Sequence, residues 1–371
     1  ASVMPFWMKH SLDRDHGGYY NCLDRDGGVW DTTKHVWLQG RQTWMFSKLY
    51  NTTMKEADVL EAAKLGAAFL KQYARTDDDR VYFSLTEDGR PTFMQRKIFS
   101  ECFYIMAMAE YARASGDDEY REEARSLFDR VVEYSRDARL VGRPVFEGTE
   151  PTEVLAIPMI LINLIDEISD PGEGTYKELE LECVERMKKH IHPEVKLVLE
   201  TVGPNGELLD TPDGRVVNPG HAIEAGWFLL TYARKIDDPD LAKTAVKMIE
   251  WSYEFGWDED FGGLFYFLDR DGYSPPALEW SMKLWWPHCE ALVGFLMAYQ
   301  HTGDEQYFEK FEKIANYSFK HFSDPEYGEW FGYCDRSGKM THRFKGGAYK
   351  GCFHVPRALY VCDNIFSELI G

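Results

Sequence analysis

Two histidines occupy similar places in two distant segments of the chain. His221 lies in the stretch NPGHAIEAGW, residues 218–227, and His354 lies in KGCFHVPRAL, residues 350–359. Each comes near the start of a segment that reads as an apolar helix. Because a free imidazole has a pKa of about 6.5, histidine both accepts and donates protons near neutral pH. Two such groups on opposite sides of a ligand suit the removal of a proton from one face and its return to the other.

That chemistry inverts a carbon atom beside a carbonyl group. In a 2-amido or 2-hydroxy sugar the ring must first open to expose the C1 aldehyde, and loss of the C2 proton then gives an enediolate-like anion. A cation such as Arg41 would stabilise the developing oxyanion. We therefore predict a sugar epimerase that requires no cofactor for its chemistry.

An internal repeat explains why these residues would meet. In each copy a turn flanked by aromatic residues, such as DRDG, precedes an apolar helical segment, an aspartate-containing break and a second helix with one polar face. The six copies, the last two of them weaker, lie at or begin near 15–50, 80–117, 260–304, 324–365, Gly142 and Gly203.

The two kinds of helix predict two layers. Segments that are apolar nearly all round, such as 98–115 and 285–300, belong inside, whereas one-sided helices such as 242–257 face water. Six inner helices alternating with six outer ones form an all-α fold, a closed (α/α)6 barrel with short β-hairpins at one end. We expect residues 1–12 to supply the first outer helix. No linker interrupts the chain, which predicts a single domain over residues 1–371.

In such a barrel every inner helix starts at the same end, so equivalent positions of the repeats converge on one pocket. Ionisable side chains on apolar helices are costly unless they are paired or used. Tryptophan faces stack on sugar rings, which favours a carbohydrate ligand. The predicted pocket residues are Arg41, Glu101, His221, Glu224, Glu290, His354 and Arg357, flanked by tryptophans that include Trp37 and Trp286.

Several of these residues have more than one interpretation. Arg41 either neutralises Glu101 or Glu290 or contacts substrate. Glu224 lies three residues after His221 on the same helix face, so it either orients that imidazole or binds substrate. His288 and Glu290 are two residues apart and point in different directions, so only one of them faces the pocket squarely.

Composition excludes several other classes of function. The net charge of −20 disfavours binding to nucleic acid and to anionic membranes. Seven cysteines without a C-x-x-C motif favour a reduced, cytoplasmic location. We find no signal peptide, no apolar run of about 18 residues, no set of metal ligands and no Walker-type phosphate loop.

Six segments, spread over nearly the whole chain, resemble the N-acylglucosamine 2-epimerase family and look closest to its animal members, also known as renin-binding proteins. The resemblance implies an (α/α)6 barrel that interconverts N-acetylglucosamine and N-acetylmannosamine. It also implies a homodimer that ATP or a related nucleotide stimulates without being consumed. The six segments are KHVWLQGRQTWMFSKLY, RKIFSECFYIMAMAE, NPGHAIEAGWFLL, LEWSMKLWWPHCEAL, DPEYGEWFGY and KGCFHVPRAL.

The resemblance also implies roles for individual residues. Many bacterial relatives have glutamine in place of His288, so we assign His288 no catalytic role, and their glycine-rich nucleotide loop has no counterpart here. Glu224 matches the glutamate of the family's H-x-x-E motif. The family's essential arginine, two histidines and glutamate fall on Arg41, His221, His354 and Glu290.

Four alternatives compete with this interpretation. A cellobiose 2-epimerase or an aldose–ketose isomerase would use the same barrel and the same types of pocket residue. An (α/α)6 glycoside hydrolase would need two carboxylates at a defined separation, and the prominence of histidines argues against it. A protein-binding role, in which the molecule captures and inhibits renin, is suggested by the family's second name.

Overall fold

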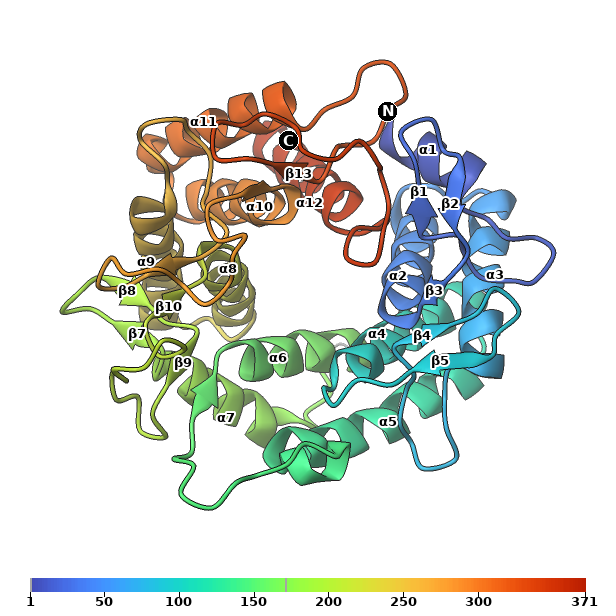
Figure 1. The fold of residues 1–371 in the computed structure, drawn as a ribbon, viewed down its shortest axis with the longest axis horizontal. Coiled ribbons are helices and arrows are strands. Elements are labelled where there is room, and N and C mark those ends of the chain that lie inside the picture. Colours follow the sequence, from blue (N-terminus) through green and yellow to red (C-terminus); the bar gives the residue numbers. More distant parts are fainter. Residues whose placement is uncertain (1, 171) are drawn as a thin grey trace.

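The chain forms two concentric rings of helices (Figure 1). The structure is a computed structural model that describes residues 2–170 and 172–371. Among these residues, six α-helices form the inner ring: α2 (Val36–Thr52), α4 (Phe99–Ser115), α6 (Ala156–Ile168), α8 (Pro219–Lys235), α10 (Trp285–Thr302) and α12 (His354–Ile370). Six more form the outer ring: α1 (Val3–His10), α3 (Ala57–Tyr73), α5 (Asp118–Arg136), α7 (Lys177–Lys188), α9 (Pro239–Gly256) and α11 (Glu305–His321). The predicted (α/α)6 barrel is confirmed, including an outer helix within residues 1–12.

Burial follows the predicted division between the rings. Helix α4 is buried without interruption from Ser100 to Ala112. Helix α5 buries only Ala124, Leu127, Phe128, Val131 and Tyr134, which lie on one face at helical spacing. One hydrophobic cluster extends from helix α1 to helix α12. Within the described ranges, no helix combines the length and apolar character needed to cross a bilayer.

Aspartates start three outer helices, as the breaks between repeats predicted. The side chains of Asp117, Asp238 and Asp304 accept hydrogen bonds from backbone N–H groups in the first turns of α5, α9 and α11. Such caps satisfy donors that have no partner within the helix, and each contributes about 1 kcal/mol. These three outer helices therefore begin at a fixed residue after a short connection.

Short strands cover the end of the barrel where the inner helices begin. Among the described residues these strands are β1 (Cys22–Leu23), β2 (Val29–Asp31), β3 (Lys34–His35), β4 (Ser84–Leu85), β5 (Pro91–Phe93), β6 (Glu153–Val154), β7 (Ile191–His192), β8 (Leu197–Val198), β9 (Thr201–Val202), β10 (Val216–Val217), β11 (Leu268–Asp269), β12 (Lys283–Leu284) and β13 (Tyr333–Cys334). Local hairpins join β1 to β2, β4 to β5 and β7 to β8.

The prediction of one self-contained hairpin in every repeat is wrong. Strands just before inner helices pair antiparallel with strands of the following repeat, as in β3 with β4, β6 with β9, β10 with β11 and β12 with β13. The predicted turns are nevertheless present, because Gly27, Gly89, Gly272 and Gly338 all have φ between 83° and 91°. Only glycine adopts that backbone without strain.

Three buried lysines fix the loops at this end. Each precedes an inner helix, and each pairs with an aspartate from a loop that follows an outer helix. The Nζ–Oδ2 distances are 2.6 Å for Lys34–Asp13, 3.1 Å for Lys283–Asp258 and 3.0 Å for Lys345–Asp324. All six side chains are at most 1% exposed. The same lysines donate to the backbone carbonyls of Gly17, Gly263 and Gly328.

These pairs keep their charges at neutral pH. Burial alone would raise the pKa of Asp258, but hydrogen bonds from Arg336 and Lys283 lower it to about 2. Burial lowers the pKa of Lys283 to about 8, although Asp258 opposes the shift. Each pair is therefore ionic, and the loss of one partner would leave a buried charge.

The two ends of the described chain meet and close the ring. Helix α1 packs against helix α12. The indole Nε1 of Trp7 donates to Glu329 Oε2 over 2.5 Å, and Glu329 Oε1 accepts from Lys350 Nζ over 2.9 Å. The side chains of Glu329 and Lys350 are fully buried. These contacts join the first outer helix to the loop that leads into the last inner helix.

We predict that Lys283→Met lowers the free energy of unfolding by about 3 kcal/mol, because it leaves the Asp258 carboxylate buried with Arg336 as its remaining cationic partner. Urea unfolding followed by circular dichroism measures the change. The exposed Lys339→Met is the matched control and should change stability by less than about 0.5 kcal/mol. Equal stability of the two variants would contradict the assigned role of the lysine.

Candidate active site

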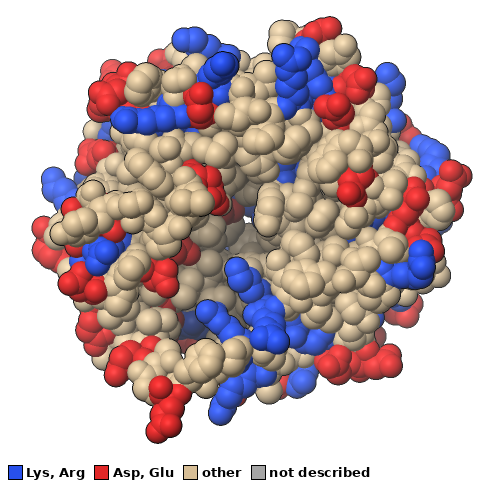
Figure 2. Space-filling view, viewed as in Figure 1, with Lys and Arg blue, Asp and Glu red and all other residues tan. Residues whose placement is uncertain are grey.

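The predicted catalytic residues lie in the first two turns of four inner helices. His354 begins α12, His221 is in the first turn of α8, and Arg41 and Glu290 occupy the second turns of α2 and α10. Asn218 caps α8 by accepting the N–H of His221, and Pro219 follows at the first helical position. Local sequence therefore sets where α8 starts. Figure 2 shows the centre of the ring hollowed on the face viewed.

A buried carboxylate, Glu290, connects the centre of the site. Its Oε1 accepts hydrogen bonds of 2.7 Å from His354 Nδ1 and from Arg357 Nη2. Its Oε2 accepts a bond of 3.0 Å from the indole Nε1 of Trp227. Arg357 Nη2 also donates to Glu224 Oε1 over 2.7 Å. Arg357 therefore bridges two carboxylates, which accounts for the burial of all three charged groups.

The contacts of His354 define its protonation state. A carboxylate only accepts hydrogen bonds, so the bond to Glu290 places the proton on Nδ1 and leaves a lone pair on Nε2. Burial lowers the pKa of His354 well below its usual value, and the cations Arg41 and Arg357 lower it further. A neutral imidazole with a free Nε2 is the form required of a general base.

His221 has the opposite electrostatic environment. Its Nδ1 lies 3.0 Å from Glu200 Oε2, and its side chain is 31% exposed. Burial disfavours the charged imidazole, but the charge and hydrogen bond of Glu200, together with the charges of Glu224 and Glu290, outweigh burial and raise the pKa of His221 above its usual value. The environment therefore favours the neutral form of His354 and the protonated form of His221, and opposite shifts of this kind are how sites separate a base from an acid.

The indole of Trp286 contacts both histidines. Its ring centroid lies 5.3 Å from that of His221 and 5.9 Å from that of His354. The two imidazoles thus flank one aromatic side chain, as the prediction of a shared pocket requires. Trp286 itself is partly buried, so it also presents surface on which a sugar ring could stack.

Arg41 is held by aromatic faces rather than by a carboxylate. Its guanidinium carbon lies 4.5, 4.1 and 4.9 Å from the ring centres of Trp37, Phe103 and Phe353. Its buried Nε has no hydrogen-bond partner among the described residues. Burial lowers the pKa of Arg41 to about 9, which still leaves it charged at neutral pH. A cation without a bonded carboxylate is available to an oxyanion.

These contacts bear on the alternatives that the sequence left open. Glu290 pairs with Arg357, and Glu224 bonds Arg357 rather than His221. Glu101 is fully buried and accepts from Arg80 Nε over 2.7 Å and from the Val81 N–H. We therefore assign Glu101 to the anchoring of its hairpin instead of to the predicted substrate contact.

His288 has a structural place. Its Nε2 accepts the backbone N–H of Leu264 over 3.0 Å, and its Nδ1 lies 2.6 Å from the carbonyl of Leu284. Burial lowers the pKa of His288 to about 3, so it stays neutral. His288 and Glu290 are two residues apart on α10, and Glu290 is the one that faces the pocket.

Sequence reasoning missed the partner of His221. Glu200 lies between strands β8 and β9, directly after the buried run Leu197–Leu199. The signal in the sequence was a lone carboxylate at the end of an apolar run. The repeat pattern pointed only to residues on the helices, and Glu200 lies outside them.

Three of these side chains also have the types that bind metal ions. The ligand atoms of Glu224, Glu290 and His354 lie within 4.8 Å of one another. Arg357, however, already donates to both carboxylates and would repel a cation at the same place. The cluster is therefore better suited to hold an imidazole than a metal.

Comparison with known proteins places the chain among sugar-converting enzymes. The family model described as N-acylglucosamine 2-epimerase matches residues 18–358. The chain is 46% identical to the N-acylglucosamine 2-epimerase of Homo sapiens, over 99% of this chain and 88% of that protein. It is 26% identical to the cellobiose 2-epimerase of Ruminococcus albus, over 89% of this chain and 87% of that one. Among solved structures, a D-mannose isomerase shares the fold with a TM-score of 0.83 at 18% identity, over 98% and 95% of the two chains.

We predict that the imidazole of His221 titrates above the usual histidine range and that of His354 below it. Glu200→Gln should lower the pKa of His221, because the charge that stabilises the imidazolium is removed. NMR of protein labelled with ¹⁵N-histidine measures both values, with His221→Asn and His354→Asn variants for assignment. An unchanged His221 titration in Glu200→Gln would contradict the pairing.

Proposed function

The chain belongs to the N-acylglucosamine 2-epimerase family, and from that premise we propose that it interconverts N-acetylglucosamine and N-acetylmannosamine at C2 of the ring-opened sugar. The observation that carries this proposal is the pair of histidines that both lie against Trp286, with pKa shifts of opposite sign. Epimerisation needs a base on one face of a carbon atom and an acid on the other, and this pair supplies both.

The first step uses the neutral histidine. Nε2 of His354 takes the C2 proton of the open-chain sugar, and the electrons of the broken C–H bond form the C1–C2 double bond. The former carbonyl electrons move to O1, which becomes an oxyanion. The free face of Arg41 stabilises that charge, and Glu290 stabilises the imidazolium formed on His354.

The second step uses the charged histidine. His221 donates its Nε2 proton to C2 from the opposite face, and the carbonyl at C1 forms again. His354 then carries the proton and His221 is neutral, which is the state needed for the reverse reaction. His221 is the more exposed of the two, so proton exchange with water resets the site through it.

The observed contacts support the alternative activities less well than they support epimerisation. An aldose–ketose isomerase moves a proton between neighbouring carbons on one face and needs only one of the two histidines. A glycoside hydrolase needs two independent carboxylates, whereas Glu224 and Glu290 share Arg357. Analysis of the products formed from N-acetylmannosamine, mannose and cellobiose separates these activities.

Further expectations that came with the family resemblance extend the proposal. They are activation by ATP or a related nucleotide, a homodimer, a cytoplasmic location and binding to renin. Each stays a prediction. Analytical ultracentrifugation, nucleotide titration of the activity and a renin pull-down test the assembly, the activator and the partner separately.

We predict that His221→Asn and His354→Asn each reduce epimerisation by about 10²–10⁴-fold and leave complementary partial reactions. With one base remaining, each variant should exchange the C2 proton of only one of the two sugars with D₂O, and the two variants should act on different sugars. ¹H NMR of the C2 signal, started from each sugar, measures the exchange.

The exposed His301→Asn at the end of α10 is the matched control and should keep the parent rate. Exchange of the same sugar by both variants would show that the two imidazoles do not serve opposite faces. A near-parental epimerisation rate in either variant would overturn the two-histidine mechanism.

A further inference from the structure

A second cavity lies at the other end of the barrel, beyond the proposed active site. Its volume is about 350 Å³, within the range of small-molecule sites. In each helix that contributes to both sites, the cavity residues come after those of the active site. On α8 the cavity begins at Trp227, and on α12 it extends from Arg357 to Glu368. Because the inner helices run in parallel, the cavity lies at their C-terminal ends.

The cavity and the active site share a wall. Arg357 and Trp227 both line the cavity. The same two side chains donate hydrogen bonds to Glu290, over 2.7 Å from Arg357 and 3.0 Å from Trp227. Glu290 in turn holds His354. A ligand that touches Arg357 or Trp227 from the cavity therefore lies one side chain away from the carboxylate that orients the base.

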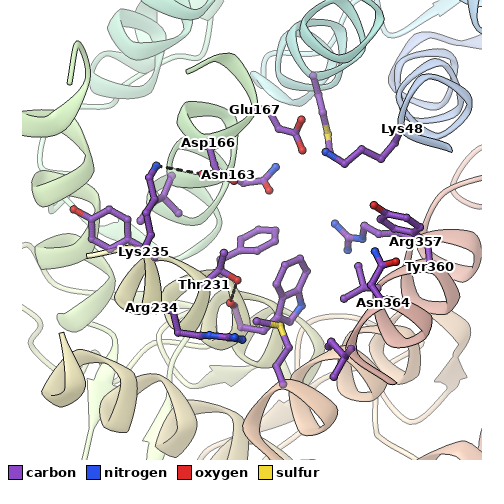
Figure 3. A pocket seen from close by; sticks show the side chains of 18 of the residues that line it. Lys48, Asn163, Asp166, Glu167, Thr231, Arg234, Lys235, Arg357, Tyr360 and Asn364 are labelled. Carbon is purple, nitrogen blue, oxygen red and sulfur yellow. Dashed lines mark hydrogen bonds and ion pairs between the residues drawn. The ribbon is translucent and has the colours of Figure 1, made fainter. Parts of the chain in front are cut away.

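Two residues that line this space have buried donors without a hydrogen-bond partner of ordinary geometry. Among the described residues, the indole Nε1 of Trp44 and the Nε of Arg357 are buried and make no hydrogen bond. Trp44 and Arg357 are 4% exposed each, so water satisfies them poorly. Figure 3 shows Lys48 and Arg357 pointing into the same open space, opposite Asn163 and Glu167. Such donors are satisfied by a ligand that offers oxygen acceptors.

Each charged side chain that lines the cavity already has a side-chain partner, which for Arg234 and Glu368 is the amide of Gln300. Lys235 contacts Asp166 and Glu180 over 3.2 and 3.3 Å. Glu167 accepts from Arg113 over 3.0 Å. A ligand with a net charge would therefore break an existing pair, whereas a neutral ligand would not.

The remaining lining combines amides with flat apolar surface. Asn163 and Asn364 each offer a donor and an acceptor, the combination that hydroxyl groups use. Trp227, Phe228 and Tyr360 provide aromatic faces. The set matches a neutral, polyhydroxylated ring of hexose size.

We propose that this cavity is a second carbohydrate site, which binds a neutral hexose or N-acylhexosamine and lowers turnover at the first site. A sugar oxygen that accepts from Arg357 Nε draws the guanidinium away from Glu290. With less positive charge near His354, the neutral base is less favoured and turnover falls. The effect on turnover rests on the proposed function, but the binding does not.

The test uses methyl N-acetyl-β-D-glucosaminide, whose blocked anomeric carbon prevents ring opening. We expect a saturable fall in kcat of about fivefold or more in the parent protein, beside any competitive rise in KM. Asn163→Trp, which fills the cavity, should abolish the fall in kcat. Asn316→Trp, on the exposed face of α11, should keep it. Each variant is compared with its own rate without the glycoside.

A crystal soaked in the same glycoside locates it without reference to activity, and we expect electron density between Trp44, Asn163 and Arg357. An empty cavity, purely competitive inhibition, or a fall in kcat that persists in Asn163→Trp would overturn the proposal. Density in the cavity of a protein that does not epimerise would instead contradict the proposed function and leave the second site standing.

Discussion

The structure depends on one buried carboxylate that would be unstable without its partners. Glu290 is 1% exposed, and an isolated charge at that depth would be strongly disfavoured. Arg357, His354 and Trp227 each give it a hydrogen bond, and they come from two other inner helices. The burial cost is therefore offset only when α8, α10 and α12 are in register. The same bonds fix the tautomer of His354, so stability of the barrel centre and readiness for proton transfer have a common origin.

The loops at the end of the barrel where the inner helices begin are held by buried ion pairs of a different kind. Loops must leave the centre open, so they cannot be held by a continuous apolar core. Buried lysine–aspartate pairs hold three of them instead, and each lysine directly precedes an inner helix or its lead-in segment. Such pairs have a narrow range of allowed geometry, and so they define loop position in a way that apolar contacts do not. The starts of α2 and α10 are placed by these pairs.

The repeat pattern predicted the barrel, the alternation of its helices and the end at which the candidate site residues lie together. It succeeded because buried apolar residues recur at regular spacing along a helix, and the six sequence repeats show the same spacing again and again. It failed where residues on separate elements interact. Glu200 was overlooked because its partner His221 lies on another element, and Glu101 was assigned to the pocket although Arg80 binds it. The strand pairings between neighbouring repeats were missed for the same reason, since a local pattern cannot show which neighbour completes it.

Closure of the ring has a consequence for the synthesis of the molecule. Helix α1 and the loop before α12 are joined through Trp7, Glu329 and Lys350. During translation α1 is synthesised long before the loop and helix that contact it, so these contacts form only after the residues between them have been made. His354 lies on α12, so a nascent chain that stops before α12 lacks one of the two candidate histidines. Closure of the ring and assembly of the candidate site therefore depend on the same late-synthesised segment.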